Sequence, residues 1–270
     1  NFAHGSVFMV GAFAGWGVLS LLARGNVLAT NPALALLAMV AAGTLATAML
    51  GATIERLAYR PLRGGSRMAP LISALGVSII LENAAMLLTS GRAKTYQTEL
   101  IFPQTWAVHV AGATISATRI AMLASSVAIM ILLDIVVSRT RFGRAMRATS
   151  QDAEAAEYIG IRTTAVIAGT FIIGSALAGV AGVMVGLYYT QIDFMIGFSA
   201  GLKAFTAAVL GGIGDFRGAA AGGMLLGLAE SIGVLIAPPV YKDAIVFAVL
   251  IITLILRPAG LLGRQVRARS

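Results

Sequence analysis

The chain has 270 residues, of which 58% are hydrophobic and only 11% are charged, a balance that excludes an ordinary soluble domain. The formal net charge is +9, but nucleic-acid-binding proteins gather their basic residues on a solvated face, whereas the arginines here border apolar runs. We therefore expect a protein embedded in the lipid bilayer that binds no nucleic acid. The sequence has no cysteine, and His4 and His109 lack a ligand spacing, so neither a disulfide nor a metal site is expected.

Eight apolar segments follow one another, and each is predicted to be a helix because the alternation of a membrane barrel is missing. They cover residues 7–23, 33–54, 69–89, 120–137, 164–187, 201–214, 219–237 and 244–256. The sixth and eighth are short, and Gly211, Gly212 and Gly214 could turn the chain inside the protein, so the sixth is expected to be a half-helix or a re-entrant segment. The predicted fold is all-α, a polytopic membrane helix bundle of about eight spans in a single domain over residues 1–270.

Arginine marks one side of this predicted bundle. The groups lie between the second and third segments, between the fourth and fifth, and in the tail: Arg56, Arg60, Arg63 and Arg67; Arg139, Arg141, Arg144 and Arg147; Arg257, Arg264, Arg267 and Arg269. Eight crossings put all three groups on the same side of the membrane. The positive-inside rule predicts that this side is cytoplasmic.

Residues 138–162 are a charged, helix-capable stretch between two apolar runs. Thr149 or Ser150 is predicted to cap a short helix whose first turns carry Asp152, Glu154 and Glu157, and Gly160 is predicted to end it. The small residues Ala153, Ala155 and Ala156 would let this helix enter a shallow groove. The pattern is typical of a surface on which another subunit docks.

Few polar residues lie inside the spans. Glu82 and Asn83 follow Ser78 in the third segment, where a carboxylate costs about 2.5 to 3.5 kcal/mol on insertion scales. Glu82 could line a path or be hydrogen-bonded between helices, and both interpretations stay open. The same two interpretations apply to Glu230, with packing favoured, and Asp134 is expected to pair with Arg139 or Arg141.

Glycines placed four apart predict close helix packing, at Gly11 and Gly15, Gly182 and Gly186, Gly218 and Gly222, and Gly223 and Gly227. The run GGIGDFRG, residues 211–218, instead gathers helix breakers around an acid and a base, as broken helices do along substrate paths. It does not fit a phosphate-binding loop, and the chain contains no G-x-x-x-x-G-K-[ST] motif with which to hydrolyse ATP. We take Ser78, Glu82, Asn83, Gly211, Gly212 and Gly214 as candidates for a translocation path.

Four blocks carry a resemblance that covers most of the chain: NFAHGSVFMVGAF, RPLRGGSRMAPLISALGVSIILEN, TRFGRAMRA and KAFTAAVLGGIGDFRGAAAGGMLLGLAE. Together they resemble the LivH-type permease of branched-chain amino acid ABC importers. The resemblance implies a bacterial inner-membrane subunit that pairs with a LivM-like permease and is supplied by a periplasmic substrate-binding protein. It also implies two cytoplasmic ATPases that bind ATP and Mg, no cofactor in this chain, and a helix upstream of Asn1.

EAAEYIG, residues 154–160, resembles the start of the loop through which ABC importer permeases contact their ATPases, but it lacks the Leu-Pro pair of the longer motif. Only the role of a coupling helix is carried over, to Asp152, Glu154, Ala155, Ala156, Glu157 and Gly160. The family often has Gln where this chain has Glu82, which could alter the polarity of the path. The family also includes permeases for urea and short amides, and among these solutes we expect leucine, isoleucine and valine as the substrates.

Two other functions would also suit a polytopic membrane protein. An ion-coupled secondary transporter could use Glu82 as its proton site, but it would not need an ATPase-docking helix. A passive channel would need repeated polar rings, which the sequence does not show.

Overall fold

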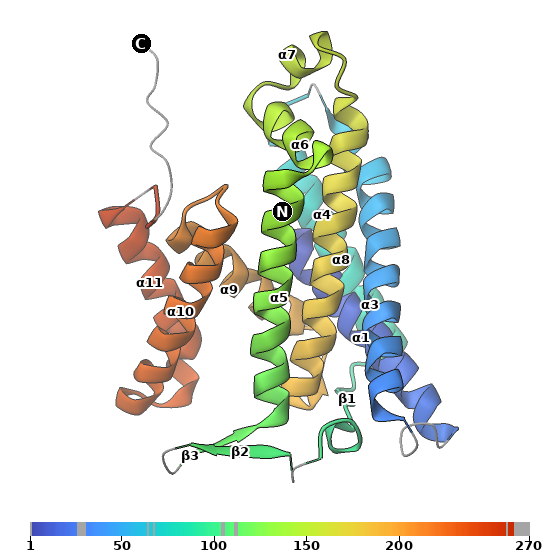
Figure 1. Cartoon of the computed structure of the whole chain (residues 1–270), viewed down its shortest axis with the longest axis vertical. Coiled ribbons are helices and arrows are strands. Elements are labelled where there is room, and N and C mark those ends of the chain that lie inside the picture. The colour runs from blue at the N-terminus through green and yellow to red at the C-terminus, as the bar shows by residue number, and fades with distance from the viewer. Residues whose placement is uncertain are drawn as a thin grey trace. The chain divides into compact units, whose positions relative to one another are not determined.

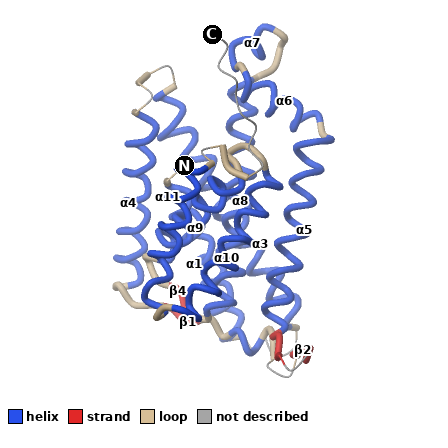
Figure 2. The backbone as a smooth tube through the Cα atoms, turned by 90° about the vertical axis from the view of Figure 1, so that its left-hand side faces the viewer, coloured by secondary structure: helices blue, strands red, loops and turns tan. Residues whose placement is uncertain are grey.

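The structure is a computed structural model that describes residues 2–25, 31–63, 65–66, 68–103, 106–110, 113–257 and 259–261. Helices dominate it, which confirms the predicted fold class (Figures 1 and 2). The α-helices of the described residues are α1 (Ala3–Arg24), α3 (Pro32–Ile54), α4 (Ala69–Thr89), α5 (Ala117–Arg139), α6 (Arg141–Gln151), α7 (Ala153–Tyr158), α8 (Thr163–Tyr189), α9 (Ile196–Gly211), α10 (Phe216–Ile236) and α11 (Lys242–Leu256).

Short elements connect these helices. A π-helical turn (Glu55–Tyr59) and a 3-10 turn (Arg60–Leu62) continue α3, and further 3-10 turns lie at Thr98–Leu100 and Pro239–Tyr241. The strands are β1 (Lys94–Thr95), β2 (Ala107–Val110), β3 (Ala113–Ser116) and β4 (Gln191–Ile192). β2 and β3 form an antiparallel hairpin, and β1 pairs antiparallel with β4.

All eight expected apolar segments are helices, but within the described residues six are long and apolar enough to cross a membrane. These six are α1, α3 with its continuation to Leu62, α4, α5, α8 and α10. The sixth and eighth segments, α9 and α11, have 16 and 15 residues. At about 1.5 Å per residue such helices are shorter than a hydrocarbon core about 30 Å thick, which agrees with their predicted shortness and leaves the predicted count of about eight spans approximate.

The chain divides into two compact units, and each is described by itself. The first contains Asn1–Ile129 and Val136–Phe198, and the second contains Met130–Ile135 and Ser199–Ser270. The expected single domain stays a prediction.

Glycines bring α1, α3 and α8 together in the first unit. A Cβ atom added to Gly11 would lie 2.6 Å from the Cα of Gly179, and one added to Gly15 would lie 2.6 Å from Val183. A Cβ on Gly186 would lie 2.6 Å from the Tyr96 ring. These approaches confirm the packing predicted for the first two glycine pairs, because only a missing side chain allows such closeness.

Tyr96 closes the first unit at the end that carries β1 and β4. Its side chain is 2% exposed, and its hydroxyl donates to the carbonyl oxygen of Ala12 at 2.5 Å. Burial raises the pKa of this hydroxyl, so Tyr96 stays protonated and keeps its donor. The β1–β4 pairing joins the chain after α4 to the chain after α8, as expected for two loops on the same side.

In the second unit only one of the two predicted glycine pairs, Gly218 and Gly222, packs closely against another helix. A Cβ on Gly218 would lie 2.5 Å from the Gly211 carbonyl oxygen, and one on Gly222 would lie 2.8 Å from the Gly211 nitrogen, so α9 and α10 pack closely there. A Cβ on Gly227 would meet no described heavy atom within 4 Å. A Cβ on Gly223 would lie 3.8 Å from the Cβ of Ala207, an ordinary van der Waals contact, so among the described residues the close packing predicted for this pair is missing at Gly227 and loose at Gly223.

Asp134 has a partner that the sequence does not indicate. Its carboxylate accepts two hydrogen bonds from the Arg217 guanidinium, at 3.2 and 3.0 Å. The sequence suggests only the neighbouring Arg139 and Arg141 as partners, because Arg217 lies 83 residues away along the chain.

Candidate functional site

A sharp corner joins α5 to α6 at the arginine-rich end of the first unit. The Thr140 hydroxyl caps α6, accepting a hydrogen bond from the Gly143 N–H at 3.0 Å and donating to the Val136 carbonyl at 2.5 Å. Phe142 lies against α8 where a Cβ on Gly169 would be 2.8 Å from its ring. The helix α6 is thus fixed to both neighbours.

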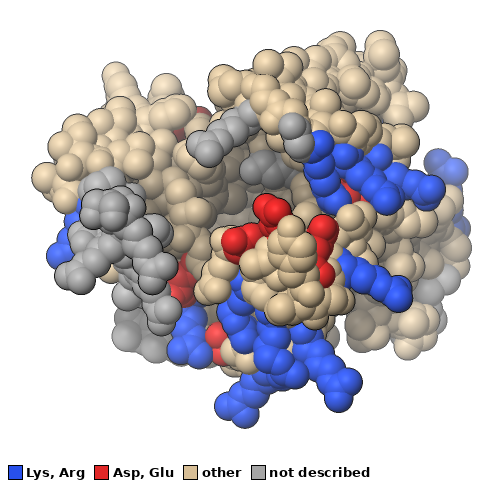
Figure 3. Space-filling view, turned by 90° about the horizontal axis from the view of Figure 1, so that it is seen from above, with Lys and Arg blue, Asp and Glu red and all other residues tan. Residues whose placement is uncertain are grey.

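Basic side chains surround the acidic ones at this end. Arg141, Arg144 and Arg147 are exposed on α6, and Arg147 donates to the Val137 carbonyl of α5. Figure 3 shows Lys and Arg gathered around a smaller acidic group on this face. Such a mixed surface suits docking to another charged surface better than contact with hydrocarbon.

Asp152 begins α7, which corrects the predicted cap. Its carboxylate accepts a hydrogen bond from the Ala155 N–H at 3.0 Å. Thr149 and Ser150 lie in α6, and the Thr149 hydroxyl is buried without a hydrogen-bond partner among the described residues. The predicted short helix therefore begins later than expected, because the extended backbone of Asp152 (φ −155°, ψ 108°) separates α7 from α6.

The other end of α7 closes at Gly160, as predicted. The Gly160 N–H donates to the Glu157 carbonyl at 2.9 Å, and the Ile161 N–H donates to the Ala156 carbonyl at 3.0 Å. This pair of bonds is a Schellman motif, which requires a left-handed residue, and Gly160 has φ +85°.

The faces of α7 differ from the expected arrangement of small residues. Asp152, Glu154 and Ala155 are exposed, whereas Ala156 is 2% exposed and packs inward. The coupling role of these residues stays a prediction. Sequence reasoning missed Tyr158 and Ile159, which are 82% and 75% exposed. The signal that could have found them is two large apolar residues inside a charged segment.

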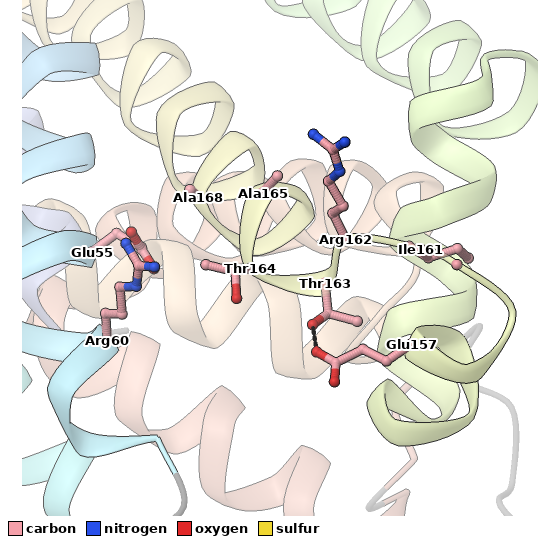
Figure 4. Close-up of a pocket in the computed structure, with 10 residues that line it drawn as sticks. Glu55, Arg60, Glu157, Ile161, Arg162, Thr163, Thr164, Ala165 and Ala168 are labelled. Atoms are coloured by element: carbon pink, nitrogen blue, oxygen red, sulfur yellow. Dashed lines mark hydrogen bonds between the residues drawn. The ribbon is translucent and has the colours of Figure 1, made fainter.

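Glu157 connects α7 to α8. The Thr163 hydroxyl, buried at the start of α8, donates to its carboxylate (Figure 4). Glu157 and Thr163 line one side of an open cleft of about 650 Å³, and Glu55 and Arg60 line the other, with Thr164 between them. The cleft therefore separates the end of α3 from the α7 segment.

An ion pair and a contact between aromatic rings hold the α3 side of the cleft in place. Glu55 is 3% exposed and forms an ion pair with Arg63, and the Tyr59 ring lies 5.0 Å from the Phe171 ring of α8. The π-helical turn that begins at Glu55 marks the point where regular helix ends, a feature common at functional sites. Of the arginines predicted here, Arg67 lies outside the described residues, as do Arg264, Arg267 and Arg269 of the tail.

Two of the predicted path residues meet in a polar cluster between α1 and α4. The Ser6 and Ser78 hydroxyls each lie 3.1 Å from a carboxylate oxygen of Glu82 and 2.6 Å from each other. Ser6 is 1% exposed, so Glu82 reaches a buried helix contact. Asn83 does not join them, since it is exposed and donates to the Ile79 carbonyl of its own helix.

The remaining path candidates belong to the second unit. Gly212 and Gly214 have φ +112° and +95° and form the turn after Gly211, and Asp215 then caps α10 by accepting from the Arg217 N–H at 2.8 Å and the Gly218 N–H at 3.0 Å. This geometry gives the glycines a role in turning and close packing. A role for them in a path stays a prediction.

These features define a class of protein: an integral membrane protein of apolar helices with a charged helical segment at one end of its first unit. The family model described as the permease component of branched-chain amino acid transport systems matches residues 1–254, and the chain belongs to this family.

Relatives along nearly the whole chain agree with this membership. The chain is 44% identical to the high-affinity branched-chain amino acid transport system permease protein BraD of Pseudomonas aeruginosa, over 98% of this chain and 86% of BraD. It is 41% identical to LivH of Escherichia coli, over 98% of this chain and 85% of LivH. A probable LivH of Methanocaldococcus jannaschii is 27% identical over 97% of this chain and 82% of its own length. No solved structure matches the chain at a significant level.

Proposed function

We propose that this chain is a membrane-spanning permease subunit of an ATP-driven ABC importer for branched-chain amino acids. The observation that carries the proposal is α7, a helix closed at both ends and exposed at the charged end of the first unit. The permease names of BraD and LivH support the substrate class.

The partners follow from the same resemblance. The chain pairs with a LivM-like permease in the bacterial inner membrane and receives substrate from a periplasmic binding protein. Two cytoplasmic ATPases bind ATP and Mg, and one of them docks on α6 and α7 of this chain, with Tyr158 and Ile159 as apolar contacts and Glu154 beside them. The chain itself catalyses no reaction.

The proposed docking segment, which consists of α6 and α7, is linked to the helices of the first unit. Glu157 and Thr163 join α7 to α8, and α8 packs through glycines on α1 and α3. When ATP closes the ATPases, movement of α7 therefore shifts the start of α8, and the permease pair alternates between outward and inward access. Coupling of this kind requires contiguous, stiff contacts, which these helices supply.

Ion-coupled transport is not favoured. The Glu82 carboxylate, its candidate proton site, accepts hydrogen bonds from Ser6 and Ser78 at a helix contact. That environment is accounted for by packing between α1 and α4, and a secondary transporter leaves the docking segment unexplained.

Dependence on the partner ATPases tests the proposed function. Uptake of radiolabelled leucine into proteoliposomes is expected only when the second permease, the ATPases, the binding protein and ATP are all present. The purified chain alone is expected to hydrolyse no ATP, because it lacks a phosphate-binding loop. Leucine uptake by the chain alone, driven by a proton gradient, would overturn the ABC assignment.

Glu82→Leu is expected to lower transport while the complex still assembles. Leucine removes the acceptor shared by the Ser6 and Ser78 hydroxyls, and a buried polar group without its partner costs about 1 to 3 kcal/mol. Glu82→Gln keeps an acceptor oxygen and serves as the control with near-normal uptake. Normal uptake by Glu82→Leu would make the residue incidental to transport, and loss of assembly would assign it to packing alone.

A further inference from the structure

The second unit holds an ion pair between two apolar helices. The Lys203 ammonium of α9 lies 2.9 and 3.0 Å from the two carboxylate oxygens of Glu230 on α10. Lys203 lies in the middle of its helix and Glu230 in the second half of its own, so neither can be a charge at a helix end. Ionisable groups within membrane helices are costly, and they commonly face a partner or a water-filled path.

The pair is not sealed inside the unit. The side chain of Lys203 is 29% exposed and that of Glu230 is 18% exposed. A lysine and a glutamate that face outward from an apolar helix hairpin do not fit a lipid-facing surface. Helix packing explains why the two charges meet, but it does not explain why both side chains remain partly exposed.

A glycine surface adjoins the pair. Gly223 and Gly227 precede Glu230 by seven and three residues, so all three lie on the same face of α10. Both glycines are exposed, and a Cβ on Gly227 would meet no described heavy atom within 4 Å. An exposed glycine face therefore lies next to one positive and one negative side chain.

We propose that Lys203 and Glu230 contact the head group of a zwitterionic amino acid as it crosses the membrane. This inference rests on the proposed function. The Lys203 ammonium binds the substrate carboxylate and the Glu230 carboxylate binds the substrate ammonium, with the aliphatic part along Gly223 and Gly227.

Their mutual pairing suits transport. With the path empty, each charge satisfies the other at about hydrogen-bond distance, so no unpaired charge is left in the membrane. A substrate must displace that contact in order to bind, which keeps its own binding weak enough for release. Uncharged solutes such as urea or short amides offer no group that compensates both side chains.

The test compares two ion pairs of the same unit in the complete reconstituted complex. Lys203→Met with Glu230→Leu removes both charges together, which avoids leaving one unpaired. Asp134→Asn with Arg217→Gln is the matched control, because it neutralises the other pair between helices. ATP-driven leucine uptake, ATPase rate and co-purification of the second permease are measured for each.

The first double variant is expected to assemble and hydrolyse ATP but to lose uptake by roughly tenfold or more, because two charge-assisted hydrogen bonds to the substrate are gone. The control pair is expected to keep near-normal uptake. The exchange Lys203→Glu with Glu230→Lys restores both charges and is expected to recover part of the uptake.

Three results would overturn the proposal. Unchanged uptake in the first double variant would make the pair dispensable. Loss of co-purification would assign the pair to the contact with the second permease. An equal loss in the control variant would indicate a general effect on the unit. Failure of the unmodified complex to take up leucine would instead count against the proposed function.

Discussion

Gly160→Val is expected to leave ATP hydrolysis in place and to abolish most of the coupled amino-acid uptake. Gly160 has φ +85°, and a β-branched residue in that conformation costs about 1 to 2 kcal/mol. No heavy atom of the described residues lies within 4 Å of an added Cβ, so the effect comes from backbone strain and not from a clash. Strain at this position breaks the two hydrogen bonds that close α7 and changes the angle at which the helix meets the ATPase.

Gly160→Asn is the matched control, because asparagine adopts the left-handed conformation at lower cost. Uptake of labelled leucine and the ATPase rate are measured together in the reconstituted complex, and protease protection checks insertion. If Gly160→Val inserts, assembles and transports at the unmodified rate, α7 is only a solvated loop. The coupling role would then pass to the arginine-containing turns after α3.

Gly179→Val is expected to prevent stable assembly of the first unit. A Cβ at this position would lie 2.5 Å from the carbonyl oxygen of Gly43 and 2.8 Å from its carbon, so α3 and α8 would have to move apart. Overpacking by a few methyl groups typically costs about 1 to 3 kcal/mol, and a backbone obstacle gives less room for relaxation than a side chain does.

Gly76→Val provides the comparison, since a Cβ at Gly76 in α4 would meet nothing within 4 Å. Thermal unfolding in detergent, followed by size-exclusion chromatography, is expected to show a large loss for Gly179→Val and a small change for Gly76→Val. Equal stability of the two variants would contradict the close approach of α3 and α8.

Helix positions were predictable because hydrophobicity is a local signal. Each of the eight apolar segments is a helix, and the two expected to be short, α9 and α11, have only 16 and 15 residues. The glycine spacings predicted contact for Gly11 and Gly182 but failed at Gly227. Spacing defines a face of a helix, but it does not say which helix, if any, covers that face.

Contacts between distant residues could not be predicted. The Ser6 hydroxyl that meets Glu82 lies 76 residues away, and the Arg217 guanidinium that binds Asp134 lies 83 residues away. The docking segment was found from its charges and its final glycine. The start of α7 at Asp152 could not be predicted, because Thr149, Ser150 and Asp152 are all suitable N-cap residues and the sequence does not show which of them has the extended backbone. The inward position of Ala156 likewise depends on tertiary packing.

The glycine contacts among α1, α3 and α8 also affect how the protein is made. The ribosome delivers α1 and α3 early, but their common partner α8 begins only at Thr163. Until then the nascent chain holds two helices whose closest contact surface is empty, together with α4 and α5, which are little buried even in the finished fold. Because domains fold as the chain is synthesised, the first unit can close only after α8 has entered the membrane. A pause or truncation before residue 189 is therefore expected to leave an inserted but open intermediate, which membrane proteases would recognise.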